Sequence, residues 1–172
     1  LPISVIKALG LPLLSIPDVE ADDVIGTLAR AASGHDMEAF IVSGDKDLAQ
    51  LVGPGVVMCD SMKDVIYDEQ GVLEKFGVPP ERIIDFLALV GDTSDNIPGV
   101  PKVGPKTAVR WLTDYGSLDA LVEKADSVSG KVGENLRASL DQLALSRELA
   151  TIKCDVPLDC EPEALIVSPP DN

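Results

Sequence analysis

Seven carboxylates fall in three short clusters, each directly after a predicted buried element. The first cluster follows the apolar run 11–16, the second the apolar run 39–43, and the third a predicted helix over 80–90. Ligand sites of open α/β sheets lie outside the carboxyl ends of strands, so the first two clusters are expected to share one cleft. The seven residues are Glu20, Asp22, Asp23, Asp45, Asp47, Asp92 and Asp95.

Convergent carboxylate oxygens are the ligands that Mg²⁺ and Mn²⁺ require, and so much negative charge needs cations to hold it together. With two ions roughly 3.5–4 Å apart, one generates hydroxide from water and the other stabilises the leaving oxygen at phosphorus. The clusters therefore predict metal-dependent phosphoester hydrolysis, with all seven residues as candidate catalytic and metal-binding groups.

Each cluster taken alone also has a structural interpretation. Acids in the first turn of a helix complement its macrodipole, and aspartates after a strand or helix form turns. The joint occurrence of three such clusters favours the metal site. The third is not a calcium loop of the EF-hand type, because Ile97 replaces its glycine and Val103 its bidentate glutamate.

A glycine-rich turn opens onto a predicted helix over residues 97–112, the pattern of a helix-hairpin-helix. This stretch holds three bases and no acid, in a chain with 29 acidic and 14 basic residues and a net charge of −15. Backbone N–H groups near Lys106 to Ala108 can receive a phosphate without reading base sequence. The alternative is a plain loop with incidental lysines. The candidate DNA-binding residues are Gly99, Val100, Lys102, Val103, Gly104, Lys106 and Thr107.

The elements that must position these groups change character along the chain. Strands are expected over 11–16, 39–43 and 55–59, alternating with helices over 1–10, 20–33 and 47–52, which predicts a parallel sheet. Helices alone are expected afterwards, over 69–76, 80–90, 105–113, 117–124 and 132–143. The predicted organisation is an α/β half over 1–67, a helical region over 68–153, and a loose tail or linker over 154–172.

Composition sets further bounds on the class of protein. Hydrophobic residues make up 45% and charged residues 25%, which is typical of a globular protein. No membrane span or signal peptide is apparent, so the cytoplasm is the expected compartment. His35, the only histidine, lies in a polar turn and receives no catalytic role, since a metal-activated water needs no imidazole.

Four segments in fixed order resemble the 5′ nuclease domains of bacterial DNA polymerase I, phage 5′ nucleases and flap endonucleases. They are VEADDVIGTLA, SGDKDLAQLV, FLALVGDTSDNIPGVPKVGPKTA and LATIK. The resemblance implies a PIN-like α/β core followed by an α-helical region with a helix-hairpin-helix. It implies that Glu20, Asp22 and Asp23 bind one Mg²⁺ or Mn²⁺ ion. Ligands or supporting acids of the other ion would be Asp45, Asp47, Asp92 and Asp95.

The same resemblance implies the substrates and partners. These are DNA with a 5′ flap, nicked or gapped duplex, and RNA primer–DNA hybrids, bound without sequence preference in the bacterial cytoplasm at the nucleoid. The resemblance also implies a K⁺ ion held by backbone carbonyls of the hairpin, and it includes the option of a covalently linked polymerase domain. The family's first strand with an essential aspartate, a further metal-binding aspartate and its helical arch would precede Leu1. We therefore expect these 172 residues alone to bind metal weakly and cleave poorly or not at all.

Two other functions remain open at this point. Gly91-Asp92 followed by Asp95 also resembles the last metal motif of haloacid-dehalogenase-type phosphatases, although the only D-x-D, at 45–47, follows a later strand than that family requires. A non-catalytic duplex-binding module would use the hairpin and leave the acids as turn and cap residues.

Overall fold

The computed structural model describes residues 3–170, which form two compact units. The first unit joins the described residues up to Ala39 with those from Lys153 onward, and the second spans Phe40–Ile152. No helix within residues 3–170 is long and apolar enough to cross a membrane.

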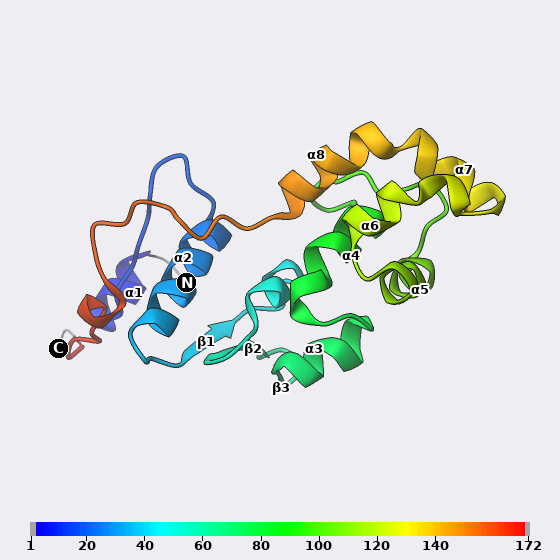
Figure 1. Cartoon of the computed structure of the whole chain (residues 1–172). Coiled ribbons are helices and arrows are strands. Elements are labelled where there is room, and N and C mark those ends of the chain that lie inside the picture. Colours follow the sequence, from blue (N-terminus) through cyan, green and yellow to red (C-terminus); the bar gives the residue numbers. More distant parts are fainter. Residues whose placement is uncertain (1–2, 171–172) are drawn as a thin grey trace. The chain divides into compact units, whose positions relative to one another are not determined.

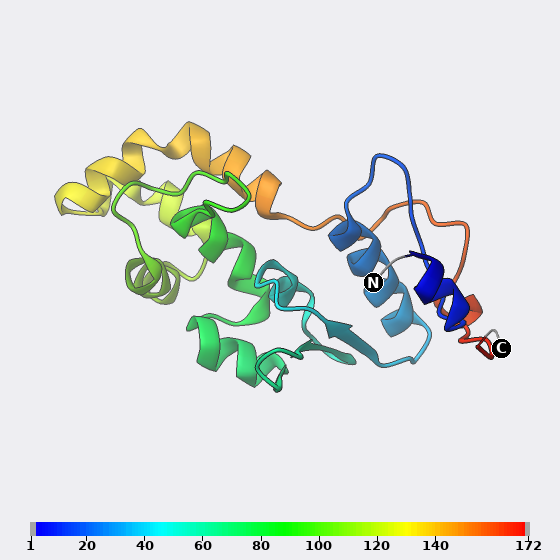
Figure 2. The same ribbon diagram turned by 180° about the vertical axis from the view of Figure 1, so that it is seen from behind.

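Two helices and the C-terminal segment build the first unit. Helix α1 spans Ile3–Ala8 and α2 spans Ala21–Gly34, close to the predicted helices, and a short 3₁₀ turn, η4, spans Pro162–Ala164. The tail was expected to be loose, but it runs past α2 toward α1 (Figures 1 and 2). The Val156 N–H donates to Thr27 Oγ1 at 3.1 Å and the Ser168 N–H to the Gly10 carbonyl at 2.8 Å.

The predicted strand over 11–16 is wrong, because this run has no regular secondary structure. Strands persist where a neighbouring strand accepts their N–H groups, and Pro12 has no such group to donate. Instead, Leu14 and Ile16 line an apolar pocket of about 400 Å³ together with Val24, Leu28 and Leu165. The apolar residues therefore correctly predict that this segment packs against the rest of its unit, but they do not predict its backbone conformation.

A three-stranded sheet begins the second unit. Strand β1 spans Ala39–Val42, β2 spans Val56–Asp60 and β3 spans Val65–Tyr67, in the order β1-β2-β3. The first two confirm predicted strands, but β2 and β3 pair antiparallel, so the sheet is mixed and not parallel throughout. The reason is a tight turn: the Asp60 carboxylate accepts the N–H groups of Met62 and Lys63, at 3.2 and 3.3 Å.

Helices make up the remainder of the second unit, and α4 lies at their centre. It packs against α5 and α8 (Figure 1) and against the 3₁₀ helix η1. Most of its side chains are buried. The elements are η1 (Asp47–Leu51), α3 (Glu69–Phe76), η2 (Pro80–Arg82), α4 (Ile83–Val90), α5 (Pro105–Tyr115), α6 (Leu118–Glu123), η3 (Ala125–Ser127), α7 (Gly130–Ala138) and α8 (Leu140–Ala150).

The single helix predicted over 132–143 is in fact two helices, α7 and α8. Ser139 separates them with a ψ of 5°. Its carbonyl accepts the N–H groups of Gln142 and Leu143 at 3.1 and 2.9 Å, so it starts a new helix in a new direction. The apolar periodicity continues across the break, and periodicity alone therefore cannot reveal it.

Candidate metal centre and hairpin

The second and third acidic clusters meet in the second unit. Carboxylate oxygens of Asp47, Asp92 and Asp95 all lie within 4.8 Å of one another. Asp47 begins η1, whereas Asp92 and Asp95 belong to the loop that follows α4. Because η1 packs directly against α4, acids 45 or more positions apart in the sequence reach one place.

A glycine pair closes the loop that carries Asp92. A Cβ atom on Gly91 would lie 2.4 Å from the Gly99 nitrogen, and one on Gly99 would lie 2.2 Å from the Val90 carbonyl oxygen. Asp92 and Ile97 exchange both backbone hydrogen bonds, at 2.8 and 2.7 Å. The two ends of the loop are therefore in backbone contact, which points its acidic residues at η1.

Asp92 and Asp45 each use one carboxylate oxygen to shape the backbone. The Ser94 N–H donates to Asp92 Oδ1 at 2.7 Å, and the Asp47 N–H donates to Asp45 Oδ1 at 3.0 Å. The second contact stabilises the start of η1, which is the turn interpretation weighed for Asp45. A turn role and a ligand role are compatible, because a carboxylate has a second oxygen.

Lys46 is the counter-ion of this cluster. Its Nζ forms an ion pair with Asp92 Oδ2 and lies 3.6 Å from Asp47 Oδ1. Asp47 Oδ1 is nevertheless the buried side-chain atom of the described residues that has no hydrogen-bond partner. One ammonium group thus balances three carboxylates, which leaves an excess of negative charge. A divalent cation would neutralise this excess and would also coordinate the buried Asp47 Oδ1.

An open pocket lies beside these carboxylates. It has a volume of about 720 Å³, large enough for a nucleotide-sized group. Loop 91–99 supplies most of its wall, and Lys46 and Val90 complete it. Its polar lining residues are Lys46, Asp92, Thr93, Ser94 and Asn96.

Burial raises the pKa of Asp47, and the charges of Asp45 and Asp95 add to this while Lys46 opposes it. A carboxyl whose pKa is higher in the folded state favours folding when protonated, so its contribution is lost as pH rises through that pKa. At pH 7 the ionised Asp47 therefore destabilises the metal-free protein. Asp47→Asn should raise its Tm by about a few degrees at pH 7. The gain should vanish near pH 3, where both forms are neutral.

Thermal unfolding followed by circular dichroism, in chelator at both pH values, checks this prediction. Asp126→Asn is the matched control, because Asp126 is exposed and should give no change in Tm at either pH. An equal Tm for Asp47→Asn and the parent chain at pH 7 would contradict the burial argument.

The first acidic cluster lies at the start of α2, in the first unit. Glu20 is the exposed N-cap residue and makes no side-chain cap bond, while Asp22 and Asp23 occupy the first turn. Asp23 Oδ1 accepts the Lys153 N–H at 2.8 Å, so this acid helps to fix the C-terminal segment. The structure describes these three acids in one unit and the cluster of Asp47, Asp92 and Asp95 in the other, and the role of the three acids in metal binding stays a prediction.

The predicted hairpin joins α4 to α5. Val100 and Val103 close a turn through a 3.0 Å backbone hydrogen bond, and their side chains are buried. Their N–H groups are both engaged within the chain, since Val100 donates to the Leu89 carbonyl at 2.9 Å and Val103 to the Val100 carbonyl. Lys102 stands at the exposed tip with a φ of 65°, and Lys106 is exposed on the first turn of α5.

One detail of the predicted phosphate site is corrected. The N–H groups of Thr107 and Ala108 both donate to the Gly104 carbonyl at 3.0 Å, so they are engaged at the N-cap. Among the three predicted donors, the Lys106 N–H is the one without an acceptor in the described part of the chain. Gly104 and Pro105 start the helix in a tight turn, which explains the difference.

Three residues with structural roles at this site lie outside the predicted set. Lys46 could have been found from its position between two acids. Ser146 Oγ donates to the Pro98 carbonyl at 2.5 Å, and Asn135 Nδ2 donates to the Pro101 carbonyl at 2.6 Å. Nothing in the sequence signals these last two contacts, because they join α7 and α8 to a loop more than 30 residues away.

Two family models match successive parts of the chain. Residues 3–77 match the family model described as 5′-3′ exonuclease, N-terminal resolvase-like domain, and residues 78–172 match 5′-3′ exonuclease, C-terminal SAM fold. The DNA polymerase I of Rhizobium leguminosarum is 47% identical over 164 residues, covering 95% of this chain and 16% of the relative.

Two further relatives are shorter proteins. The 5′-3′ exonuclease of Aquifex aeolicus is 40% identical over 167 residues, covering 97% of this chain and 57% of its own length. The solved structure of the T5 5′-exonuclease with bound zinc is 25% identical and superposes with a TM-score of 0.75, covering 81% of this chain and 52% of its own. The chain thus spans between about one sixth and three fifths of these relatives.

Proposed function

Because the chain belongs to the 5′-3′ exonuclease family, we propose that it forms part of a divalent-metal-dependent 5′ nuclease that hydrolyses phosphodiester bonds in 5′ flaps and primers. One observation carries the proposal. Loop 91–104 bears Asp92 and Asp95 of the carboxylate cluster near its first end and Lys102 of the hairpin near its second, and Lys106 follows on the first turn of α5. A backbone phosphate held by the hairpin would therefore belong to a strand that also reaches the carboxylates.

The proposed metals are Mg²⁺ or Mn²⁺ at two sites. Asp47, Asp92 and Asp95, supported by Asp45, would hold one ion, and the acids at the start of α2 the other. When bound, the ions supply Lewis-acid activation of water and charge stabilisation at the leaving oxygen. The structure of the T5 relative with zinc supports a divalent-metal centre in this family. A K⁺ ion on hairpin carbonyls within 99–108 is proposed from the family resemblance.

The chain's own groups orient the substrate and balance its charge. Lys46, which pairs with Asp92, is placed to release that carboxylate to a cation and to pair with a phosphate oxygen instead. The hairpin supplies Lys102, Lys106 and the free Lys106 N–H, all of which contact phosphates and not base edges. The proposed partners are 5′-flapped, nicked or gapped DNA and RNA primer–DNA hybrids, bound without sequence preference.

We also propose a cellular location and a domain organisation for the protein. The DNA polymerase I and 5′-3′ exonuclease relatives are bacterial, which supports a cytoplasmic, nucleoid-associated protein with a linked polymerase domain. Residues 1–67 would contribute to the nuclease core, 68–153 would form the helical DNA-binding region, and 154–172 the tail. The change of family model between residues 77 and 78 supports a boundary in this part of the chain.

Lys102→Ala and Lys106→Ala should weaken duplex DNA binding uniformly across sequences. Each variant removes one phosphate contact, so the slope of log affinity against log salt should become shallower by about 0.9. Fluorescence anisotropy of a labelled duplex at several salt concentrations measures both quantities. Lys131→Ala is the matched control, because Lys131 is exposed and pairs with Glu134. A slope equal to that of the control would remove the hairpin from the interface.

A cleavage assay with two substrates tests the proposed function. We expect Mn²⁺ to support slow hydrolysis of a 5′-flapped duplex with protein in excess, and no hydrolysis of p-nitrophenyl phosphate. Hydrolysis of p-nitrophenyl phosphate without flap cleavage would instead support the phosphatase. Duplex binding with neither Mn²⁺ binding nor hydrolysis of either substrate would support the binding module.

A further inference from the structure

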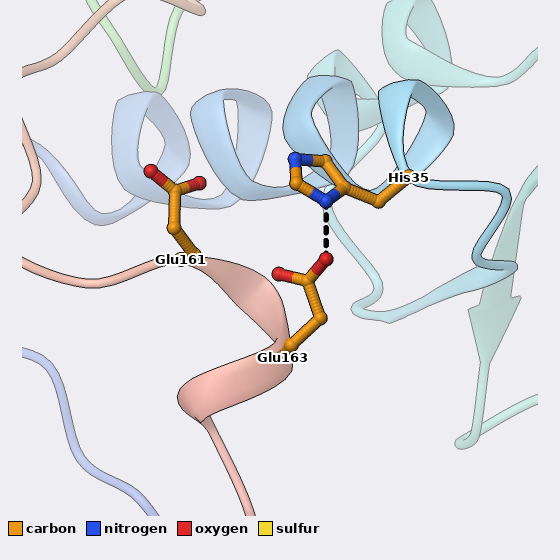
Figure 3. Close-up of side chains that lie close together, drawn as sticks. All are labelled: His35, Glu161 and Glu163. Atoms are coloured by element: carbon orange, nitrogen blue, oxygen red, sulfur yellow. Dashed lines mark ion pairs between the residues drawn. The ribbon is translucent and has the colours of Figure 1, made fainter.

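A second group of metal-ligating side chains lies in the first unit. His35 follows the last residue of α2, and Glu161 and Glu163 flank and occupy the η4 turn of the C-terminal segment. One ligand atom from each residue lies within 4.8 Å of the others. His35 Nδ1 forms an ion pair with Glu163, and Glu161 lies beside the pair on the same segment (Figure 3).

Backbone contacts hold the two sides of this group in place. The His35 and Met37 N–H groups both donate to the Ala32 carbonyl at 3.0 Å, which orients the end of α2. On the other side, the Ala164 N–H donates to the Glu161 carbonyl at 3.0 Å, and Leu165 packs into the apolar pocket beside α2. Hydrogen bonds and packing therefore fix the backbone that carries each of the three candidate ligands.

Charge favours a cation at this place. The C-terminus of α2, a helix of 14 residues, carries the negative end of its macrodipole. The two glutamates add two negative charges, and neither forms an ion pair with a lysine or arginine within residues 3–170. The ion pair with His35 involves Glu163 alone, and the imidazole is charged only when protonated.

We propose that His35, Glu161 and Glu163 bind a zinc ion that fastens the C-terminal segment to the end of α2. One imidazole and two carboxylates form a three-ligand set of the kind Zn²⁺ accepts, with water in the fourth position. An imidazole nitrogen selects Zn²⁺ over Mg²⁺, which prefers oxygen ligands. This site is separate from the carboxylate cluster of the second unit and does not depend on the nuclease proposal.

His35 is the only histidine in the chain, so its ring is a single-site spectroscopic probe. The experiment is an NMR titration of the whole chain, labelled with ¹⁵N-histidine and freed of metal, with ZnCl₂ in the presence of excess Mg²⁺. We expect one equivalent of Zn²⁺ to shift the ring nitrogen signals and a chelator to reverse the shift. Amide hydrogen exchange at Val156 and Ser168 should slow on binding, because the segment is fastened at a further point.

Two variants decide whether the site is the proposed one. The double variant Glu161→Gln, Glu163→Gln should lose the shift or require at least about tenfold more Zn²⁺. Because both glutamates are exposed, these substitutions should affect the stability of the fold little, and the circular dichroism spectrum of the variant verifies that it is folded. The double variant Asp92→Asn, Asp95→Asn should keep the shift. Unmoved ring signals in the parent chain, or an undiminished shift in the glutamate variant, would overturn the proposal.

Discussion

Asp92→Asn should lower the affinity for Mn²⁺ by at least about tenfold and abolish metal-dependent flap cleavage, while leaving the affinity for duplex DNA within error. Asp92 is 7% exposed, pairs with Lys46 and lies at the centre of the converging carboxylates. Asparagine keeps the size of the side chain and the oxygen that accepts the Ser94 N–H. The change therefore removes charge and leaves the loop in place.

Isothermal titration with MnCl₂ and the flap assay measure these effects, with anisotropy for DNA affinity. Asp126→Asn removes one negative charge from an exposed position of the same unit and serves as the control. Equal Mn²⁺ affinities in the two variants would mean that net charge, and not this cluster, attracts the metal. Loss of both metal and DNA binding would indicate a disrupted loop.

Gly91→Ala should be among the most destabilising single-methyl changes in the chain. The added Cβ would lie 2.4 Å from the Gly99 nitrogen and 2.8 Å from the Ile97 carbonyl oxygen, both of them backbone atoms. The residue also has a φ of 78°, which side chains other than glycine disfavour. We expect a loss of about 3 kcal/mol or more in the free energy of unfolding, and a loss of Mn²⁺ binding with it.

Urea unfolding measured by circular dichroism checks the first effect. Gly104→Ala is the matched control, because a Cβ at Gly104 meets nothing within 4 Å and its φ is −105°. This control should cost less than about 1 kcal/mol. If the two variants are equally stable, the close contact between residues 91 and 99 does not hold the loop.

The strong net negative charge is compatible with a DNA partner because of where the charges lie. The acids that converge are expected to bind cations, and the hairpin between residues 97 and 112 has bases and no acid. Binding through so few bases should be weak and salt-dependent. Local charge distribution is therefore a better guide to the partner than the total.

Local patterns were enough to locate the helices, two of the three strands, the hairpin and the three acidic clusters. Apolar periodicity and cap residues reflect interactions within one element, so they can be read along the chain. The pairing of β2 with β3, the break at Ser139 and the coil over 11–16 each depend on contacts that a periodic pattern does not encode.

The convergence of the acidic side chains depends on tertiary packing, which local patterns do not specify. That Asp47 reaches Asp92 and Asp95 depends on η1 packing against α4, and the ion pair of Lys46 and the orphaned oxygen of Asp47 follow from that packing. His35 likewise meets Glu163 only because the tail returns to α2 across more than 120 residues. Residue types carry the chemistry, but distance, burial and charge balance belong to contacts between distant segments, which exist only once the chain is folded.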